Sequence, residues 1–396
     1  MFNKAPKGEQ ITISFFGKTN VGKSSVLNAI TAQNISIVSE IKGTTTDPVY
    51  KSMELLPLGS TKLVDTPGYN DESKLGKMRI LKTMEILDKT DIAVLVCEAD
   101  TELSDIDFEF INRLKERNTP FIVALNKSDK AKKRKQLEKN EIYISAKTGE
   151  NIFELKNMLG NIILKKEKNT KLIGEFLNED DIVVLVTPID SSAPKSRIIL
   201  PQQQTIRDIL DTNAICVVAK ETQLSQTLEI LKGKIKLVVC DSQVFGYVNN
   251  LVPKEIPLTS FSILFARYKG FLDAALKGIK KLENLNNGDC ILISEGCTHH
   301  RQCKDIGTKK LPKWISNHTK KDLSFEFSSG GYFPKDLSKY SLIVHCGGCM
   351  LTEKEFSNRI KSAETQNIPI TNYGILIAQI NGILKRSCEI LEIKNK

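Results

Sequence analysis

The stretch GKTNVGKS, residues 17–24, directly follows the apolar run ITISFF of residues 11–16. It matches the pattern G-x-x-x-x-G-K-S, whose glycines let backbone N–H groups surround phosphate oxygens. In this pattern we expect Lys23 to reach the β- and γ-phosphates and Ser24 to offer its hydroxyl to Mg²⁺. A helix that begins at Lys23 adds the positive end of its dipole. The stretch therefore predicts a nucleoside triphosphate site directly after a β-strand.

Two further motifs supply groups for the metal ion and the γ-phosphate. DTPG, residues 65–68, closes the strand KLV, where Asp65 can hold the Mg²⁺ shell and the Gly68 amide can meet the γ-phosphate. GTTTD, residues 43–47, lies between the first helix and that strand, where a switch loop could bring Thr45 to Mg²⁺. The residues that we expect to act at the γ-phosphate are Lys23, Thr45 and Gly68, and those at Mg²⁺ are Ser24, Thr45 and Asp65.

The last two nucleotide motifs select the base. NKSD, residues 126–129, ends the strand FIVAL, and a carboxylate at Asp129 can accept both the N1–H and the 2-amino group of guanine, which adenine does not offer. SAK, residues 145–147, follows IYI and would close over the base. In this order and spacing the motifs predict binding of GTP and GDP. The nucleotide-binding residues that we expect are Gly17, Asn20, Val21, Gly22, Lys23, Ser24, Ser25, Thr45, Asp65, Gly68, Asn126, Lys127, Asp129, Ser145, Ala146 and Lys147.

Short β-branched runs alternate with helical patterns from Gln10 to about Lys165. Alternation on this scale is typical of βαβ units and predicts an α/β fold with a mostly parallel sheet and helices on both faces. A charged stretch, residues 165–171, reads as a linker to two smaller α/β regions. We expect a GTP-binding domain at 8–166, a middle domain at 172–262, which carries no visible chemistry and favours a role in assembly, and a third domain at 263–396.

Composition excludes several classes of protein. The chain has 396 residues, with 57 basic and 47 acidic side chains and a net charge of +10, a length that suggests two or three domains. No apolar run approaches the ~18–20 residues that cross a bilayer, and residues 1–10 lack a secretory signal, so we expect a cytoplasmic protein with no membrane partner. Lysine clusters such as residues 130–135 could bind nucleic acid, but a solvated helix face is the commoner meaning of such runs.

On these motifs the first 165 residues resemble the TRAFAC-class small GTPases, nearest to the Era and MnmE group. The residue after DTPG is Tyr69, where Ras-like proteins carry the glutamine that orients water, so the resemblance implies another route to catalysis. Asn20 matches the loop asparagine that helps MnmE-like relatives bind K⁺ at the phosphates. The resemblance therefore implies a slow GTP hydrolase that K⁺ stimulates over Na⁺.

The nine cysteines fall into two groups, and their odd number in a reducing compartment argues against a disulfide framework. Four of them, Cys297, Cys303, Cys346 and Cys349, lie near three of the four histidines, in Cys297-Thr298-His299 and, after 45 intervening residues, His345-Cys346-Gly347-Gly348-Cys349. Three thiolates with imidazoles suit either a tetrahedral Zn²⁺ or a 4Fe–4S cluster with an exchangeable fourth position, and spacing alone leaves both open. The cysteines that read as small core residues are Cys97, Cys216, Cys240, Cys290 and Cys388.

The order C-x-H … H-C-x-x-C behind an Era-like GTPase and a small middle domain resembles the HydF family of FeFe-hydrogenase maturation GTPases over the whole chain. The resemblance implies a 4Fe–4S cluster on Cys297, Cys346 and Cys349, with His345 or His299 near the fourth iron. It also implies dimerisation through the middle domain and a scaffold that carries the 2Fe subcluster precursor. The implied partners are the radical-SAM maturases HydE and HydG and the apo-hydrogenase HydA.

A second interpretation is an Era-like ribosome or RNA GTPase with a zinc-stabilised C-terminal domain. The sequence pI of about 9.0 and the lysine clusters favour it, but no RNA-binding module is recognisable. It predicts bound zinc and an RNA affinity that falls steeply with salt, whereas the first interpretation predicts iron and sulfide. Cys303 lies outside the family motif, and we expect it to be structural.

Overall fold

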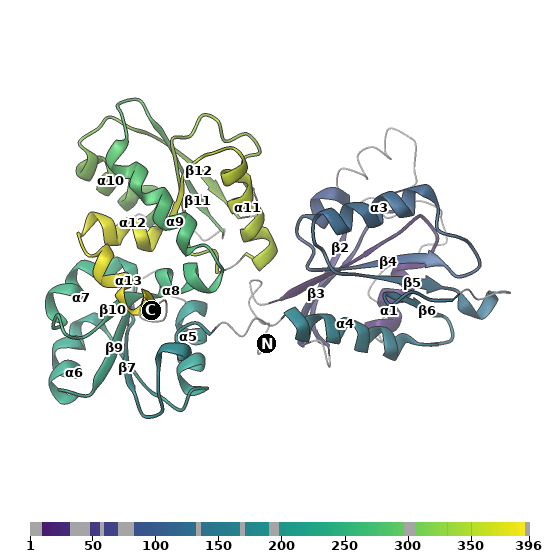
Figure 1. Cartoon of the computed structure of the whole chain (residues 1–396), viewed down its shortest axis with the longest axis horizontal. Helices are drawn as coiled ribbons and strands as arrows, with labels where there is room; N and C mark the ends of the chain where they lie inside the picture. Colours follow the sequence, from purple (N-terminus) through teal and green to yellow (C-terminus); the bar gives the residue numbers. More distant parts are fainter. Residues whose placement is uncertain are drawn as a thin grey trace. The chain divides into compact units, whose positions relative to one another are not determined.

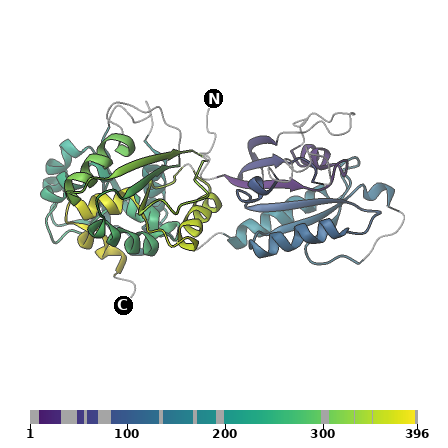
Figure 2. The same cartoon turned by 90° about the horizontal axis from the view of Figure 1, so that it is seen from above.

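The chain divides into two compact units, Met1–Lys168 and Asn169–Lys396 (Figures 1 and 2). The computed structural model describes residues 10–31, 48–55, 59–69, 83–131, 136–166, 171–189, 198–296, 306–330, 332–349 and 351–392. Within these ranges, no helix is both long and apolar enough to cross a membrane.

The first unit contains a six-stranded sheet in the order β2-β3-β1-β4-β5-β6. All neighbouring strands pair in parallel except β2, which runs antiparallel to β3. The sequence predicted the five parallel strands but not β2, because polar and apolar residues alternate along this edge strand and form no apolar run. The strands are β1 (Ile11–Phe16), β2 (Val49–Leu55), β3 (Gly59–Asp65), β4 (Ile92–Glu98), β5 (Phe121–Asn126) and β6 (Glu141–Tyr143).

Side chains along the central strands alternate between the two faces of this sheet. Phe15 packs in one core with α1 (Lys23–Thr31) and α4 (Ile152–Lys166), and Phe16 packs in the other with α3 (Asp105–Glu116). Figure 1 shows α3 on the opposite side of the sheet from α1 and α4. Because both faces are buried, the strands read as continuous apolar runs, and the predicted α/β class is confirmed.

The second unit contains two parallel four-stranded sheets, with the orders β10-β9-β7-β8 and β12-β11-β13-β14. Each sheet places its second strand at one edge, followed by its first, third and fourth strands. The two halves of this unit therefore share one topology. Their strands are β7 (Ile182–Val186), β8 (Ile215–Ala219), β9 (Ile235–Cys240), β10 (Leu258–Ser260), β11 (Cys290–Glu295), β12 (Ser324–Ser329), β13 (Leu342–His345) and β14 (Ile370–Asn372).

The sequence repeats together with the topology at the last strand of each half. PLTSFSILFARYKG, residues 257–270, corresponds to PITNYGILIAQING, residues 369–382. Both stretches end on a glycine in the left-handed region, with φ of 70° at Gly270 and 67° at Gly382. Gly270 ends a helix, so the long helical stretch expected over residues 260–285 is interrupted.

The helix that follows the last strand of each half begins at a polar N-cap. Ser260 caps α8 (Phe261–Tyr268) and Asn372 caps α12 (Tyr373–Ile380), each by accepting a hydrogen bond from the third backbone N–H of its helix. The other helices of this unit are α5 (Leu200–Leu210), α6 (Leu224–Ile230), α7 (Phe245–Leu251), α9 (Leu272–Ile279), α10 (Leu311–Thr319), α11 (Glu353–Thr365) and α13 (Leu384–Glu392).

One continuous hydrophobic core joins the two halves of the second unit. The helix α9, which connects the two halves, packs on β14, and α13 of the second half packs on β10 of the first. At Gly278 in α9, a Cβ atom would lie 2.1 Å from the carbonyl oxygen of Ile370, so the helix backbone lies directly on the strand. Figure 1 shows α8, α12 and α13 in the region between the two sheets. The domain boundary expected at 262/263 falls inside α8 and stays a prediction.

Candidate functional site

The loop after β1 closes around the ammonium group of Lys23. Its Nζ donates to the carbonyl oxygens of Gly17 at 3.1 Å and of Lys18 at 2.8 Å, and the residue is 8% exposed. Burial lowers the pKa of Lys23 to about 8, although the charge of Asp65 acts in the opposite direction. A buried ammonium at the first turn of a helix is suited to an anionic phosphate ligand.

Two glycines of this loop have a positive φ, 147° at Gly17 and 93° at Gly22. A Cβ atom at Gly17 would lie 2.3 Å from the carbonyl oxygen of Val96, and one at Gly22 would lie 2.4 Å from Nδ2 of Asn126. Strands β4 and β5 therefore approach the loop so closely that both positions require glycine.

The oxygens expected at Mg²⁺ meet beside this loop. The hydroxyl of Ser24 donates to Oδ2 of Asp65 at 2.5 Å. Asp65 is 1% exposed, and among the described residues its Oδ1 has no hydrogen-bond partner. Burial raises the pKa of Asp65, against the opposing effects of the Ser24 hydrogen bond and of Lys23. Hydroxyl and carboxylate oxygens are the ligands that Mg²⁺ prefers, so an orphaned buried carboxylate oxygen beside a serine hydroxyl fits this ion.

The base motifs are joined to the phosphate loop through Asn126. Its Nδ2 donates to the carbonyl oxygen of Val21 at 2.9 Å, and its Oδ1 accepts from the backbone N–H of Ala146 at 3.1 Å. The hydroxyl of Ser145 donates to Oδ1 of the exposed Asp129 at 2.8 Å. One amide side chain therefore brings GKTNVGKS, NKSD and SAK to a common edge of the sheet.

Lys127 of the NKSD motif also contacts the phosphate loop GKTNVGKS. Lys127 adopts a φ of 64°, and its Nζ donates to the carbonyl oxygen of Asn20 at 2.9 Å and pairs with Glu98. Asn20 is exposed and has a φ of 68°, which asparagine tolerates better than most residues. Ser25 is half-buried and Lys147 is exposed.

The DTPG segment lies directly on the phosphate loop. A Cβ atom at Gly68 would lie 2.4 Å from Oγ1 and 2.7 Å from the backbone nitrogen of Thr19, so only glycine fits there. The preceding Thr66 bonds to the carbonyl oxygen of Phe15 through both its backbone N–H and its hydroxyl. Thr45 lies outside the described residues.

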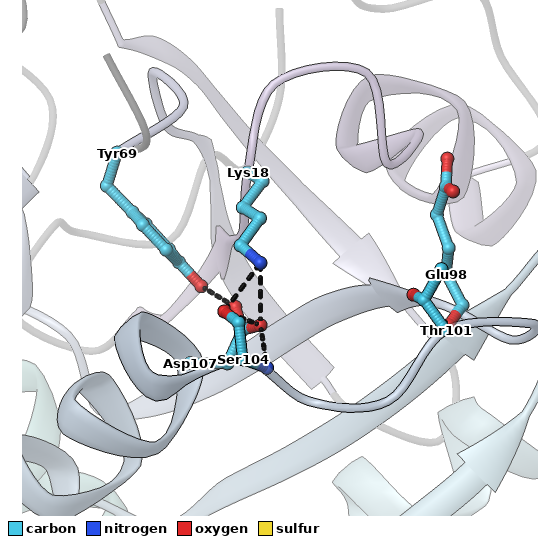
Figure 3. A network of polar contacts seen from close by, with 6 residues as sticks. All are labelled: Lys18, Tyr69, Glu98, Thr101, Ser104 and Asp107. Carbon is cyan, nitrogen blue, oxygen red and sulfur yellow. Dashed lines mark hydrogen bonds and ion pairs between the residues drawn. The ribbon is translucent and has the colours of Figure 1, made fainter. Parts of the chain in front are cut away.

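A polar network that sequence motifs did not identify connects this loop to α3 (Figure 3). Nζ of Lys18 lies 3.1 Å from Oδ2 of Asp107 and donates to Oγ of Ser104 at 2.5 Å. The hydroxyl of Tyr69 donates to the other carboxylate oxygen, Oδ1, at 2.8 Å. Burial acts to raise the pKa of Asp107, but hydrogen bonds from Ser104, Tyr69 and Lys18 outweigh it and hold that pKa below the usual value. No sequence signal pairs residues this far apart along the chain.

The described part of the cysteine motif forms a tight loop after β13. Sγ of Cys346 accepts backbone N–H groups from Gly296 at 3.0 Å and Gly348 at 3.3 Å. Gly348 has a φ of 62°, and a Cβ atom there would lie 2.6 Å from the ring of Phe356. Burial raises the pKa of Cys346 to about 11, although these two N–H groups lower it. Two backbone donors aimed at one sulfur suit a thiolate that binds metal.

His345 and Arg359 lie beneath this loop. His345 is fully buried, and its Nδ1 lies 2.7 Å from the carbonyl oxygen of Cys346. Its Nε2 lies 3.0 Å from a guanidinium nitrogen of Arg359. On the opposite side, Nζ of Lys269, the residue that ends α8, donates to the carbonyl oxygen of Gly348 at 2.5 Å. The loop is therefore held by both halves of the second unit.

Two predicted metal residues, Cys297 and His299, lie outside the described part of the chain, and so does Cys303, which we expected to be structural. Within the described part, no group of three or more His, Cys, Asp or Glu side chains is placed to hold a metal ion. Among the cysteines expected in the core, Cys97, Cys240 and Cys388 are buried, and Cys216 and Cys290 are half-buried.

Comparison with protein families divides the chain into three matched segments. Residues 172–270 match the hydrogen maturase F dimerization domain, and residues 273–390 match the hydrogen maturase F tetramerization domain. Residues 12–127 match the family described as 50S ribosome-binding GTPase. The two hydrogen maturase matches together span more than half of the chain, and the third makes the first unit a GTPase domain.

Curated relatives match the first unit. The tRNA modification GTPase MnmE of Thermoanaerobacter pseudethanolicus is 36% identical over 186 residues, which are 44% of this chain and 38% of that protein. GTPase Der of Mycoplasmopsis agalactiae is 36% identical over 178 residues, 40% of this chain and 39% of that protein. The match thus spans less than half of the length of either relative. A crystal structure of a probable GTP-binding protein engB has 27% identity and a TM-score of 0.33, over 39% of this chain and 100% of that chain.

Proposed function

Because the chain belongs to the hydrogen maturase F family and carries a GTPase domain, we propose that it is a GTP-hydrolysing scaffold that holds a 4Fe–4S cluster and delivers the 2Fe subcluster precursor to apo-hydrogenase. The observation that carries the proposal is the order of the segments: a GTPase domain with a guanine motif precedes two hydrogen maturase segments, the second of which contains the cysteine loop. We place this work in the cytoplasm, with HydE and HydG as suppliers and HydA as acceptor.

In the GTPase step, the chain's own groups hold and orient the nucleotide. Lys23 would bind the β- and γ-phosphates, and Ser24, Asp65 and Thr45 would hold Mg²⁺. When bound, Mg²⁺ would neutralise charge on the phosphate oxygens. The amide of Gly68 would bond to the γ-phosphate, so that the DTPG segment responds to its presence. Partner affinity measured with a GTP analogue and with GDP tests this switch, because equal affinities contradict it.

Tyr69 does not replace the glutamine that orients water in Ras-like proteins. Its hydroxyl is committed to Asp107, and the residue is 7% exposed. Water orientation and charge compensation must therefore come from elsewhere, which supports slow hydrolysis with K⁺ bound near Asn20. Hydrolysis rates in K⁺ and in Na⁺ at equal ionic strength test this role, since equal rates remove Asn20 from the mechanism.

For the cluster, the chain supplies Cys346, Cys349 and Cys297 as thiolate ligands. Gly296, whose N–H bonds to Sγ of Cys346, directly precedes Cys297 in the sequence, so the third cysteine is tethered within one residue of the loop. Three thiolates with one open position suit a 4Fe–4S cluster that exchanges a ligand, and the open position leaves a place for cargo. For the fourth iron the family motif offers two histidines, His299 and His345.

The first half of the second unit supports an anionic role for Cys346. There, Oδ1 of Asp241 accepts a hydrogen bond from the backbone N–H of Gln243 at 3.0 Å. In the second half, Sγ of Cys346 accepts the equivalent hydrogen bond from the backbone N–H of Gly348, also two residues further along the chain. Both residues follow the last residue of the third strand of their half. A carboxylate at one position and a sulfur at the other indicate that this turn suits a negative charge.

Self-association follows from the two hydrogen maturase matches, and we assign dimerisation to residues 172–262 and cluster binding to residues 263–396. The edge strand β8 is suited to pair with a second copy, because its sequence is apolar and Val218 is 46% exposed. The corresponding edge strand β12 carries Glu326, which bonds to Lys339 and Tyr340. A charged residue on an edge opposes sheet pairing, so β12 is the weaker candidate.

The experiment that tests the scaffold is anoxic purification followed by iron, sulfide and zinc analysis, with EPR after dithionite reduction. We expect about four irons and four sulfides per chain, and a reduced-cluster signal that Cys297→Ala abolishes. Cys388→Ala, a buried cysteine away from the loop, is the matched control and should keep the signal. One zinc and no sulfide, even after reconstitution, would overturn the proposal and favour a zinc-bearing regulatory GTPase.

A further inference from the structure

We infer that Arg359 is a positioning residue of the cysteine loop, and that it fixes the ring of His345 so that the ring supports Cys346 instead of binding iron. The inference rests on the proposed cluster site and concerns its fourth iron position. It assigns to Arg359 a role that no motif indicated.

The hydrogen-bond partners at its two ring nitrogens, Arg359 and the carbonyl of Cys346, together determine the tautomer of His345. One guanidinium nitrogen lies 3.0 Å from Nε2 of His345 and donates to Oγ of Ser294 at 3.3 Å, and the other donates to the carbonyl oxygen of Gly330 at 2.5 Å. A guanidinium group donates and cannot accept, so Nε2 must accept and carries no proton. The ring proton therefore lies on Nδ1, which donates to the carbonyl oxygen of Cys346.

This assignment removes both ring nitrogens of His345 from metal binding. A metal-binding histidine donates one N–H to an oxygen and offers the lone pair of the other nitrogen to the metal. In His345 the Nδ1–H has such an oxygen, at Cys346, but the lone pair of Nε2 faces Arg359. A cationic guanidinium thus occupies the direction from which a metal ion would bind.

Packing holds the ring in this orientation. His345 makes an edge-to-face contact with Phe356 at a centroid distance of 5.1 Å, and the guanidinium of Arg359 lies 5.2 Å from the ring centre of Phe333. Arg359 is 6% exposed. Turning the imidazole toward the loop would break the bonds to Arg359 and Cys346 and leave buried polar groups without partners, which is unfavourable.

The first half of the second unit provides an internal comparison. Cys240 pairs with Val186 as His345 pairs with Ser294, so the two residues occupy corresponding positions. Cys240 is fully buried, which shows that this position accepts a small side chain in the same fold. The imidazole and its arginine therefore accompany the cysteine loop and are not required by the sheet.

The consequence concerns the fourth iron. With His345 committed to the loop, the fourth iron of the proposed cluster would take another ligand. An exchangeable ligand suits a scaffold that must accept and release its cargo.

The tautomer can be measured on the chain without iron. The protein has four histidines, so ¹⁵N-histidine labelling and long-range ¹H–¹⁵N NMR give few signals, and His345→Gln assigns the one of interest. We expect a neutral ring with the proton on Nδ1. Arg359→Leu removes the donor to Nε2, so the Nε2 chemical shift should move to that of a lone pair without a hydrogen bond, and Arg359→Lys should keep the wild-type shift because a lysine ammonium can also donate to Nε2. Arg386→Leu, which removes another partly buried arginine of this unit, should leave the nitrogen chemical shifts of His345 unchanged.

Two results would overturn the inference. One is a wild-type ring with its proton on Nε2, or one whose Nε2 chemical shift Arg359→Leu leaves unchanged. The other is a nitrogen coupling in the pulsed EPR spectrum of the reconstituted, reduced cluster that His345→Gln abolishes. If no variant, the wild type included, assembles a cluster, the proposed scaffold fails, yet the tautomer measurement still decides the role of Arg359.

Discussion

Tyr69→Phe separates a structural role of the network around Asp107 from a catalytic one. The change removes one hydroxyl, which donates to Oδ1 of Asp107 at 2.8 Å, and keeps a ring that stacks on Phe110 with a centroid distance of 5.2 Å. Losing a buried hydrogen bond to a charged group costs about 1.5–3 kcal/mol. For a domain of this size that corresponds to a melting temperature lower by roughly 3–12 °C.

The full chain offers an internal control for this measurement. Its single tryptophan, Trp314, lies in the second unit, so fluorescence reports that unit, while hydrogen exchange of β1 and β4 reports the first. We expect Tyr69→Phe to increase exchange in β1 and β4 and to leave the Trp314 transition in place. A shift of the Trp314 transition with unchanged exchange in β1 and β4 would refute the assignment.

The same variant tests the catalytic role. Because the hydroxyl of Tyr69 is committed to Asp107, we expect the GTP hydrolysis rate in K⁺ to stay within about twofold of the wild type. A tenfold loss corresponds to about 1.4 kcal/mol of transition-state stabilisation. Such a loss, measured at a temperature where both proteins are folded, would mean that the hydroxyl acts in the reaction.

The stability difference also depends on pH in a defined direction. Hydrogen bonds hold the pKa of Asp107 below its ordinary value of 3.8 in the folded state. The carboxylate therefore contributes stability above about pH 4, and this contribution is lost as the pH falls through the folded pKa. We expect the difference between Tyr69→Phe and the wild type to shrink under acid, and a difference that grows would contradict this.

Three further predictions concern other sites. Gly22→Ala places a Cβ atom 2.4 Å from Nδ2 of Asn126, and we expect GDP affinity to fall at least tenfold in a fluorescent-nucleotide titration; unchanged affinity would show that the loop relaxes. Because burial lowers the pKa of Lys23 to about 8, its ammonium group loses its proton above that pH when no nucleotide is bound. GTP affinity should therefore fall by up to ~10-fold per pH unit between pH 8 and 9. Lys23→Met should abolish this pH dependence. In sedimentation at micromolar concentration, Val218→Lys should give monomers. Phe327→Lys, at the corresponding position of β12, should leave the dimer intact. The reverse result would move the dimer contact to β12.

Local sequence was sufficient for most of the nucleotide site. In GKTNVGKS the residue types and the start of α1 follow from a local pattern that predicts the loop, whereas the close approach of Val96 and Asn126 to its two glycines is visible only in the fold. The buried strands read as apolar runs for the same reason. Two further features are encoded locally but were not predicted. The helical periodicity of residues 260–285 masked the break at Gly270, and substitutions masked the repeat of residues 257–270 at 369–382.

Other features depend on chain segments that meet only after folding. Strand β2 lies at a sheet edge and lacks an apolar run, so its pairing with β3 was not predicted. The bond between Tyr69 and Asp107 joins a loop to a helix from a different βα unit. The motif alone made His345 a candidate iron ligand, and the position of Arg359 is what commits its nitrogens elsewhere.

The sequence by itself determined the class of fold, the GTPase motifs and which cysteine and histidine residues are candidate metal ligands, because these follow from residue types at short spacings. The tertiary structure alone decided that the two hydrogen maturase segments share one core and that Lys269 of the first contacts the cysteine loop of the second. It also decided which nitrogen of His345 carries the proton. The physical reason is that hydrogen-bond partners and packing neighbours distant in sequence are selected by the fold, and no periodicity in the chain records them.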